Sequence, residues 1–219
     1  MENPDQTENL AAGAATSKRE LRKARFEEAI RKEKRKSRLW ITAIIAGVIL
    51  CIAGIMWALI ARNKNLPGEL YPNQGQSHVE LNKEFTYNSN PPTSGPHFPS
   101  PASWGTYDYE ANDKFFIHNL EHGGIWISYR PSVPASVVSD LKGIINEFSG
   151  SKIVMTPRSA NDTDVAIAAW TRLLKFNLEN GTLSAKQKDE IRSFYRALKN
   201  HGPEFVPDEM PGIDPKSVK

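Results

Sequence analysis

The chain has 219 residues, a formal net charge of +3 and a single cysteine, Cys51. Its charge is uneven: residues 1–38 carry eleven Lys and Arg against seven Asp and Glu, and the part after residue 64 carries fifteen against eighteen. The mildly acidic C-terminal part lacks the basic patch of a nucleic-acid-binding domain, and one cysteine excludes a disulfide framework or a thiolate metal site within the chain.

The first 38 residues are expected to form a basic, partly helical arm. Residues 1–16 are polar and rich in Ala, Gly and Asn, a composition that predicts disorder. Residues 17–38 place Glu among Lys and Arg at helical spacings, and Ser17 with Glu20 matches a capping box. We expect a solvated juxtamembrane helix that contacts anionic lipid, with a coiled-coil or partner-binding role as the alternative.

Residues 39–61 form an uncharged apolar run of about 23 residues, long enough to cross a hydrocarbon core of ~30 Å. Trp40 and Trp57 lie near its ends, as aromatic residues do at membrane interfaces. The run is longer and starts later in the chain than the apolar region of a cleaved signal peptide. Its length and its lack of a polar face also argue against a buried helix in the core of a soluble protein. We therefore predict a signal-anchor: one transmembrane helix whose partner is the lipid bilayer.

The charges that flank this run predict its orientation. Two basic residues, Arg62 and Lys64, follow it, whereas five precede it closely: Lys32, Lys34, Arg35, Lys36 and Arg38. Because the more basic flank stays in the cytoplasm, the N-terminus should be cytoplasmic and the C-terminal domain exterior to the cell membrane. An exterior domain without cysteines is more typical of bacteria than of secreted eukaryotic proteins.

After the span, the sequence predicts a linker at 62–68, one exterior domain at 69–206 and a flexible tail at 207–219. Residues 69–106 are rich in Pro, Asn, Ser and Gly, so this region should be mostly loop. Hydrophobic periodicity predicts short strands at 78–81 and near 85–87, strands at 115–118, 125–129, 152–156 and 165–170, and helices at 134–148 and 184–200. The fold class is α+β, with a small antiparallel or mixed sheet and two packed helices.

The histidines are concentrated in one part of the chain. Four of the five, His78, His97, His118 and His122, precede the first predicted domain helix, and Glu121 lies between the last two. The sequence His118–His122 matches the H-x-x-E-H motif of inverzincin metalloproteases, which requires a helix. Because strands are predicted on both sides and Gly123 and Gly124 follow, we expect a strand end and a turn, with the protease motif as a coincidence.

A strand end with a glycine turn can still bring the imidazoles together, because glycine allows a tight bend. The proposed ligands are His97, His118 and His122, with His78, Glu121 or Met155 completing the set. Imidazoles with a carboxylate suit zinc or copper, and a thioether from Met155 would favour copper. The alternative for Met155 is ordinary core packing.

Two motifs in order, PPTSGPH at 91–97 and HNLEHG at 118–123, resemble the bacterial family called domain of unknown function 3105. Shorter segments at 105–107, 154–157, 166–170 and 202–204 are also similar to it, so the resemblance covers roughly residues 69–206. The resemblance implies a short cytoplasmic arm, one anchor helix and an exterior domain. It implies no activity.

Three functions are compatible with these residues. The first is metal handling at the cell surface, with a histidine cluster that binds a transition metal, copper rather than zinc. The second is a metal-dependent or His/Glu-based hydrolase in which Glu121 is the general base. The third is an envelope structural or interaction module without metal, which would be favoured by imidazoles more than ~8 Å apart, too far to share one ion.

Overall fold

The computed structural model describes residues 4–64 and 66–218, and the chain divides into two compact units, Met1–Lys64 and Asn65–Lys219. The first unit is one helix, α1 (Pro4–Lys64). Helix α1 runs through Ser17 without a break, so residues 4–16, predicted to be disordered, are helical, and Ser17 does not start a helix. The part of the predicted disordered segment before Pro4 lies outside the described residues.

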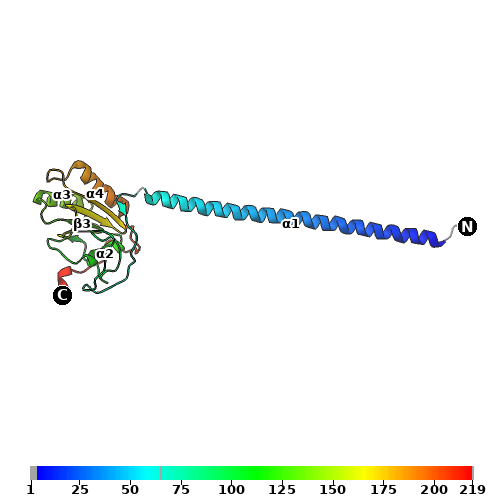
Figure 1. The fold of residues 1–219 in the computed structure, drawn as a ribbon, viewed down its shortest axis with the longest axis horizontal. Helices are drawn as coiled ribbons and strands as arrows, with labels where there is room; N and C mark the ends of the chain where they lie inside the picture. The colour runs from blue at the N-terminus through cyan, green and yellow to red at the C-terminus, as the bar shows by residue number, and fades with distance from the viewer. Residues whose placement is uncertain (1–3, 65, 219) are drawn as a thin grey trace. The chain divides into compact units, whose positions relative to one another are not determined.

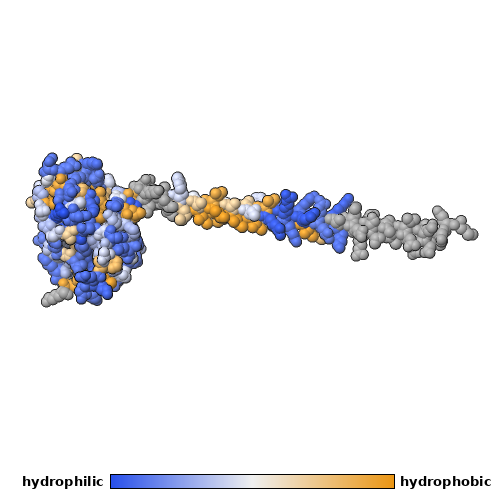
Figure 2. Space-filling view, viewed as in Figure 1, coloured by the Kyte–Doolittle hydropathy of each residue, from blue (hydrophilic) through white to orange (hydrophobic). Residues whose placement is uncertain are grey.

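Helix α1 contains a segment, Arg25–Ala58, that is long and apolar enough to span a membrane. Large apolar side chains along it, such as Leu50 and Trp57, are exposed. Figure 2 shows a hydrophilic band followed by a hydrophobic band along the helix, which matches the predicted order of basic arm and apolar span. An exposed apolar surface of this length is what a membrane-spanning helix presents to lipid.

The second unit contains one six-stranded mixed sheet of strand order β1-β6-β5-β3-β4-β2 (Figure 1). Strand β4 pairs in parallel with β2 and β3, and the other pairs are antiparallel. The predicted α+β class with a mixed sheet is confirmed. The strands are β1 (Glu69–Leu70), β2 (Gly105–Thr106), β3 (Ile125–Tyr129), β4 (Ile153–Pro157), β5 (Val165–Ala169) and β6 (Arg172–Phe176).

Helices α3 (Ala135–Glu147) and α4 (Ala185–Leu198) share a buried core with one face of the sheet, as the sequence predicts (Figure 1). Ser184 begins α4 with a capping box, in which its side chain accepts from Gln187 N and its own N–H donates to the Gln187 side chain. Alternate residues of β3 face this core, because side chains of a strand point to opposite sides in turn. Ile125 and Ile127 therefore pack with α3 and α4, and Trp126 packs on the other side.

The other face carries a third helix, α2 (Asp113–Glu121), where the sequence predicted a strand at 115–118 and a turn. That prediction was wrong. Asn112 caps the start of α2 by accepting a hydrogen bond from Lys114 N. At its end Gly123 adopts a positive φ of 74°, and the N–H groups of Gly123 and Gly124 donate to Leu120 O and Asn119 O. This is a helix-terminating Schellman motif, so the two glycines end a helix and do not join two strands.

Strand β6 was not predicted from the sequence. It pairs with β5 along its whole length and follows a tight turn in which Thr171 has a φ of +60°. Such a conformation favours Gly, Asn or Asp, so a Trp-Thr pair gives no turn signal. The sheet is consequently larger than the sequence indicates.

The segment after residue 206, expected to be a flexible tail, contains a backbone bridge and a short 3₁₀ helix. Ile213 forms a bridge with Ala102: its N–H donates to Pro101 O, and its carbonyl accepts from Ser103 N. Asp214 then caps a short 3₁₀ helix, η1 (Pro215–Ser217). Backbone pairing thus attaches the tail to the loop that precedes β2.

Candidate metal centre

Two histidines are placed by the loop-rich region between β1 and β2. His97 N donates to Ser77 O at 3.0 Å and Val79 N donates to His97 O at 2.8 Å, so His78 and His97 form a parallel bridge. Gly95 has a φ of +118°, and a side chain there would also crowd the ring of Tyr87. The strand expected at 78–81 is reduced to this single bridge, which holds the two histidine side chains near each other.

The last turn of α2 supplies the other predicted ligands. His118, Glu121 and the C-cap residue His122 follow the i, i+3, i+4 spacing that puts side chains on one face of a helix. Nε2 of His118 lies 3.1 Å from Nε2 of His122. The H-x-x-E-H motif is therefore helical, and the reason for treating it as a coincidence no longer applies.

These two segments meet at the Glu121 carboxylate. Its Oε2 atom lies 2.9 Å from Nε2 of His97 and 3.9 Å from Nε2 of both His78 and His118. One ligand atom from each of these four residues lies within 4.8 Å of the others, so the group could hold a metal ion. The separation of more than ~8 Å that would favour a module without metal is not found among these imidazoles.

Backbone carbonyls orient two of the imidazoles. Nδ1 of His97 lies 2.8 Å from Gly95 O, and Nδ1 of His118 lies 2.7 Å from Phe98 O. A carbonyl can only accept, so each Nδ1 carries a proton and, in the neutral ring, each Nε2 presents a lone pair to the Glu121 side. Metal-binding histidines are commonly fixed in this way by a partner on the opposite nitrogen.

A second, overlapping group consists of His118, Glu121, His122 and Glu204. Oε2 of Glu204 lies 3.2 Å from Nε2 of His122. Glu204 lies in the segment after α4, and its N–H donates to Glu121 O at 3.1 Å. Sequence reasoning did not select Glu204 as a ligand; its only signal was its place in the Gly-Pro-Glu segment that resembles the family.

A buried lysine holds this segment against the end of α2. The Lys152 amine donates to His122 O at 3.0 Å, to Asn200 Oδ1 at 2.7 Å and to Val206 O at 2.7 Å. Burial lowers the pKa of Lys152 from its usual range. The charged side chain is stabilised by these acceptors and thereby connects Asn200 and Val206, which lie on either side of Glu204, to the end of α2.

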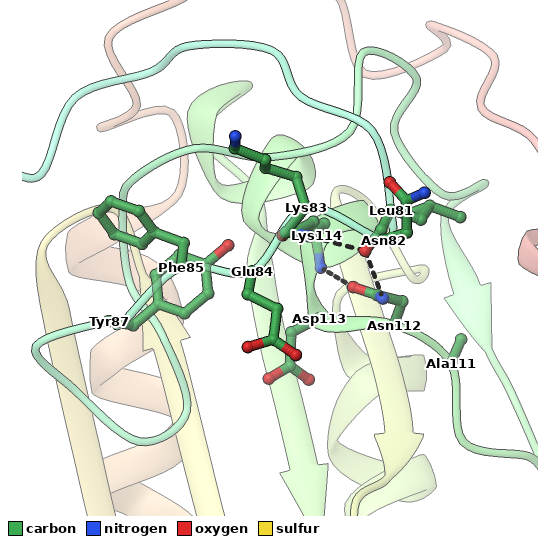
Figure 3. Close-up of a pocket in the computed structure, with 10 residues that line it drawn as sticks. All are labelled: Leu81, Asn82, Lys83, Glu84, Phe85, Tyr87, Ala111, Asn112, Asp113 and Lys114. Carbon is green, nitrogen blue, oxygen red and sulfur yellow. Dashed lines mark hydrogen bonds between the residues drawn. The ribbon is translucent and has the colours of Figure 1, made fainter.

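The centre is buried except at two ligands. His97, His118, Glu121 and His122 are at most 4% exposed, whereas the side chains of His78 and Glu204 are 51% and 54% exposed. A neighbouring hollow of about 540 Å³, shown in Figure 3, is lined by residues 81–85, Tyr87 and residues 111–114 at the start of α2. This hollow is not lined by any of the six candidate ligands, which are His78, His97, His118, Glu121, His122 and Glu204. Of these six, His78 and Glu204 are the ligands whose side chains are exposed to solvent.

Burial also affects the charge of the imidazoles. It lowers the pKa of His118 to about 4 and moves the pKa of His122 below its usual value. Both rings are therefore neutral near pH 7, the form in which imidazole binds metal.

The lowered pKa of His118 predicts a pH-dependent stability of the metal-free protein. Below pH ~6.5 the unfolded chain gains a proton on this ring, but the folded chain gains it only near pH 4. The free energy of unfolding should thus fall as pH falls across this window, by up to about 3 kcal/mol from His118. Urea titrations at pH 7 and pH 4.5 measure the loss, which should be smaller for His118→Asn. An equal loss in that variant would contradict the assignment.

Met155 and His201 lie elsewhere. The Met155 side chain is fully buried in the core shared with α3 and α4, on the opposite face of the sheet from α2. The structure therefore does not bring Met155 to the histidines, because neighbouring residues of β4 alternate between the two faces. His201 follows α4, is exposed, and has Nδ1 3.2 Å from Lys199 O.

Comparison with known families finds a match to the domain after α1. The sequence model of a family described as a protein of unknown function matches residues 78–209, which include all six candidate ligands. Comparisons with curated proteins and with solved structures find no match. The matched range is more than half of the chain and contains both the PPTSGPH and the HNLEHG motifs. The chain therefore belongs to the family described as protein of unknown function (DUF3105).

Proposed function

We propose that the domain after α1 binds a divalent transition-metal ion through His78, His97, His118 and Glu121. The observation that carries the proposal is the convergence of these four side chains from two separate segments, with ligand atoms within 4.8 Å of one another. Two of the rings are oriented by backbone carbonyls so that their Nε2 lone pairs point to the shared carboxylate. Buried imidazoles and a buried carboxylate placed this closely are stabilised by a cation between them.

The identity of the ion follows from the donors. The preference for copper depended on a thioether from Met155, which lies on the other face of the sheet. Three imidazoles and one carboxylate remain, and these donors suit Zn²⁺ and Cu²⁺ alike. The proposal is accordingly for this class of divalent ions.

The cellular setting is part of the proposal. The apolar run of α1 would anchor the chain in the cell membrane, with the basic arm in the cytoplasm and the metal-binding domain outside it. The charge difference between the two flanks of the run supports this orientation. The function would then be metal handling at the cell surface, with lipid and no nucleic acid as partner.

Equilibrium dialysis of the full chain in detergent tests the binding. After removal of metal with a chelator, the protein is dialysed against Zn²⁺ or Cu²⁺ and analysed for bound metal. We expect at least one ion per chain, with binding weakened by His118→Ala and unchanged by His201→Ala, a matched histidine outside the centre. A content near zero, or full binding by His118→Ala, would refute the proposal.

A metal-dependent hydrolase is the second candidate, and one observation favours it. The H-x-x-E-H motif lies on a helix, and its two histidines converge as that motif requires. Glu121 would then activate a metal-bound water as a general base. The two functions assign different roles to Glu121: a metal ligand in the first and a base in the second.

A further inference from the structure

The centre contains more donor atoms than one ion needs. Two groups of four residues share His118 and Glu121, so six residues offer ligands in total. From this overlap we infer that the centre holds two ions, bridged by the Glu121 carboxylate. The first ion is bound by His78 and His97, and the second by His118, His122 and Glu204. The inference rests on the proposed metal binding, adds a second ion and assigns His118, which both groups share, to that second ion.

The division follows from what each side chain can offer. A carboxylate has two oxygens and can bind two ions, whereas Nε2 of His118 has one lone pair and serves one ion, since its Nδ1 is bonded to Phe98 O. Assigning His118 to the second ion leaves three protein ligands for the first ion and four for the second. Every donor atom of both groups is then used once, apart from the bridging carboxylate.

The measured distances agree with this division. Tetrahedral ligands at bond lengths of ~2.0–2.2 Å are about 3.3–3.6 Å apart. For the second ion, His118 Nε2 and His122 Nε2 are 3.1 Å apart, and His122 Nε2 and Glu204 Oε2 are 3.2 Å apart. For the first ion, Glu121 Oε2 lies 2.9 Å from His97 Nε2 and 3.9 Å from His78 Nε2. Glu121 Oε2 lies 3.9 Å from His118 Nε2, so the bridging carboxylate has to turn toward the second ion.

His122 offers its Nε2 atom to the second set. The residue is 3% exposed, and among the described residues Nδ1 has no hydrogen-bond partner. No backbone acceptor therefore fixes the proton on Nδ1, in contrast to His97 and His118. Nε2 of His122 faces two acceptors, the lone pair of His118 and the carboxylate of Glu204. In the metal-free ring a proton on Nε2 can be donated to either of these acceptors, and when an ion binds Nε2 the proton moves to Nδ1.

Each proposed position also has its own access to solvent. His78 belongs only to the first set and Glu204 only to the second, and the side chain of each is about half exposed. An ion can therefore reach either position without crossing the other. Each position should bind a divalent metal ion that prefers imidazole and carboxylate ligands.

Metal stoichiometry with Glu204→Gln tests the inference. The full chain in detergent is stripped of metal, dialysed against Zn²⁺ and analysed for zinc per chain, with far-UV circular dichroism to confirm folding. We expect two ions in the wild type and one in Glu204→Gln, because this half-exposed amide keeps the shape but loses the charge. The control His201→Asn should keep two ions.

The outcomes separate this inference from the proposed function. One zinc in the wild type would overturn the two-ion centre and leave metal binding intact, whereas no zinc would overturn both. Two zinc ions in Glu204→Gln would overturn the assignment of Glu204. As a second readout, Cu²⁺-loaded wild type should give a weaker electron paramagnetic resonance signal per copper than Glu204→Gln, because two bridged ions couple. Equal signals per copper would also contradict the bridge.

Discussion

Glu121→Gln is expected to weaken metal binding by about 100-fold or more, equal to about 2.7 kcal/mol, while the metal-free fold is retained. Glu121 belongs to both ligand groups, and its carboxylate lies in the buried part of the centre. An amide of the same shape supplies a neutral oxygen and an N–H₂ group in its place, so it is a much poorer ligand. His118 is the other residue that both groups share, but in the two-ion division it serves only the second ion.

The metal-free protein should tolerate this change well. Nε2 of His97 lies 2.9 Å from Glu121 Oε2, a hydrogen-bond distance that needs a proton between the two atoms. The amide of Gln can donate to Nε2 of a neutral His97 and so keep this contact, and thermal unfolding of the metal-free variant should occur near the wild-type temperature. A stable variant that binds metal poorly would show that the carboxylate serves the ion.

The same variant distinguishes a ligand from a general base. Dialysis against Zn²⁺ gives the dissociation constant, and turnover of model peptide and ester substrates by the metal-loaded protein gives any hydrolytic activity. Unchanged zinc affinity with loss of turnover would contradict the ligand role and favour the hydrolase. Loss of zinc with no turnover in the wild type would favour metal handling.

Periodicity was a good guide to the three central strands, β3, β4 and β5, and to the helices on one face of the sheet. Strand β3 and helix α3 were predicted to within one residue at each end, since each has a buried face and clear end signals. Helix α2 was misread because Phe115, Phe116 and Ile117 are all buried. A helix surrounded by core has no polar stripe, and such a short apolar run is indistinguishable from a buried strand.

The centre was predictable as a set of histidines but not as a complete ligand set. The rarity and spacing of His97, His118 and His122 identified them, and the fold brings them together. Glu204 is one of many carboxylates in the sequence, and only the backbone contact with Glu121 places it beside His122. Met155 was a reasonable ligand by chemistry, but strand alternation directs it into the opposite core. Tertiary contacts, which no local pattern contains, decide both cases.

Gly202→Ala is expected to destabilise the domain by about 3 kcal/mol and to lower its melting temperature by roughly 6–12 °C. A Cβ atom at Gly202 would lie 2.1 Å from Glu121 O and 2.3 Å from Gly123 N. Both are backbone atoms of the end of α2, where the helix is already terminated by its glycine motif, so neither can move freely. The segment that carries Glu204 would have to separate from α2, and the hydrogen bond from Glu204 N to Glu121 O would be lost.

Calorimetry of the metal-free full chain in detergent measures this change, and Gly143→Ala is the matched control. Gly143 is exposed within α3, and no atom lies within 4 Å of the position that a Cβ atom would take, so alanine there should raise stability by about 0.5–1 kcal/mol through helix propensity. If alanine lowers the stability at position 202 and raises it at position 143, the loss at Gly202 is caused by the close backbone contact there and not by the Gly-to-Ala change itself. A wild-type melting temperature for Gly202→Ala would mean that the segment does not pack on α2, and the placement of Glu204 beside His122 would then be wrong.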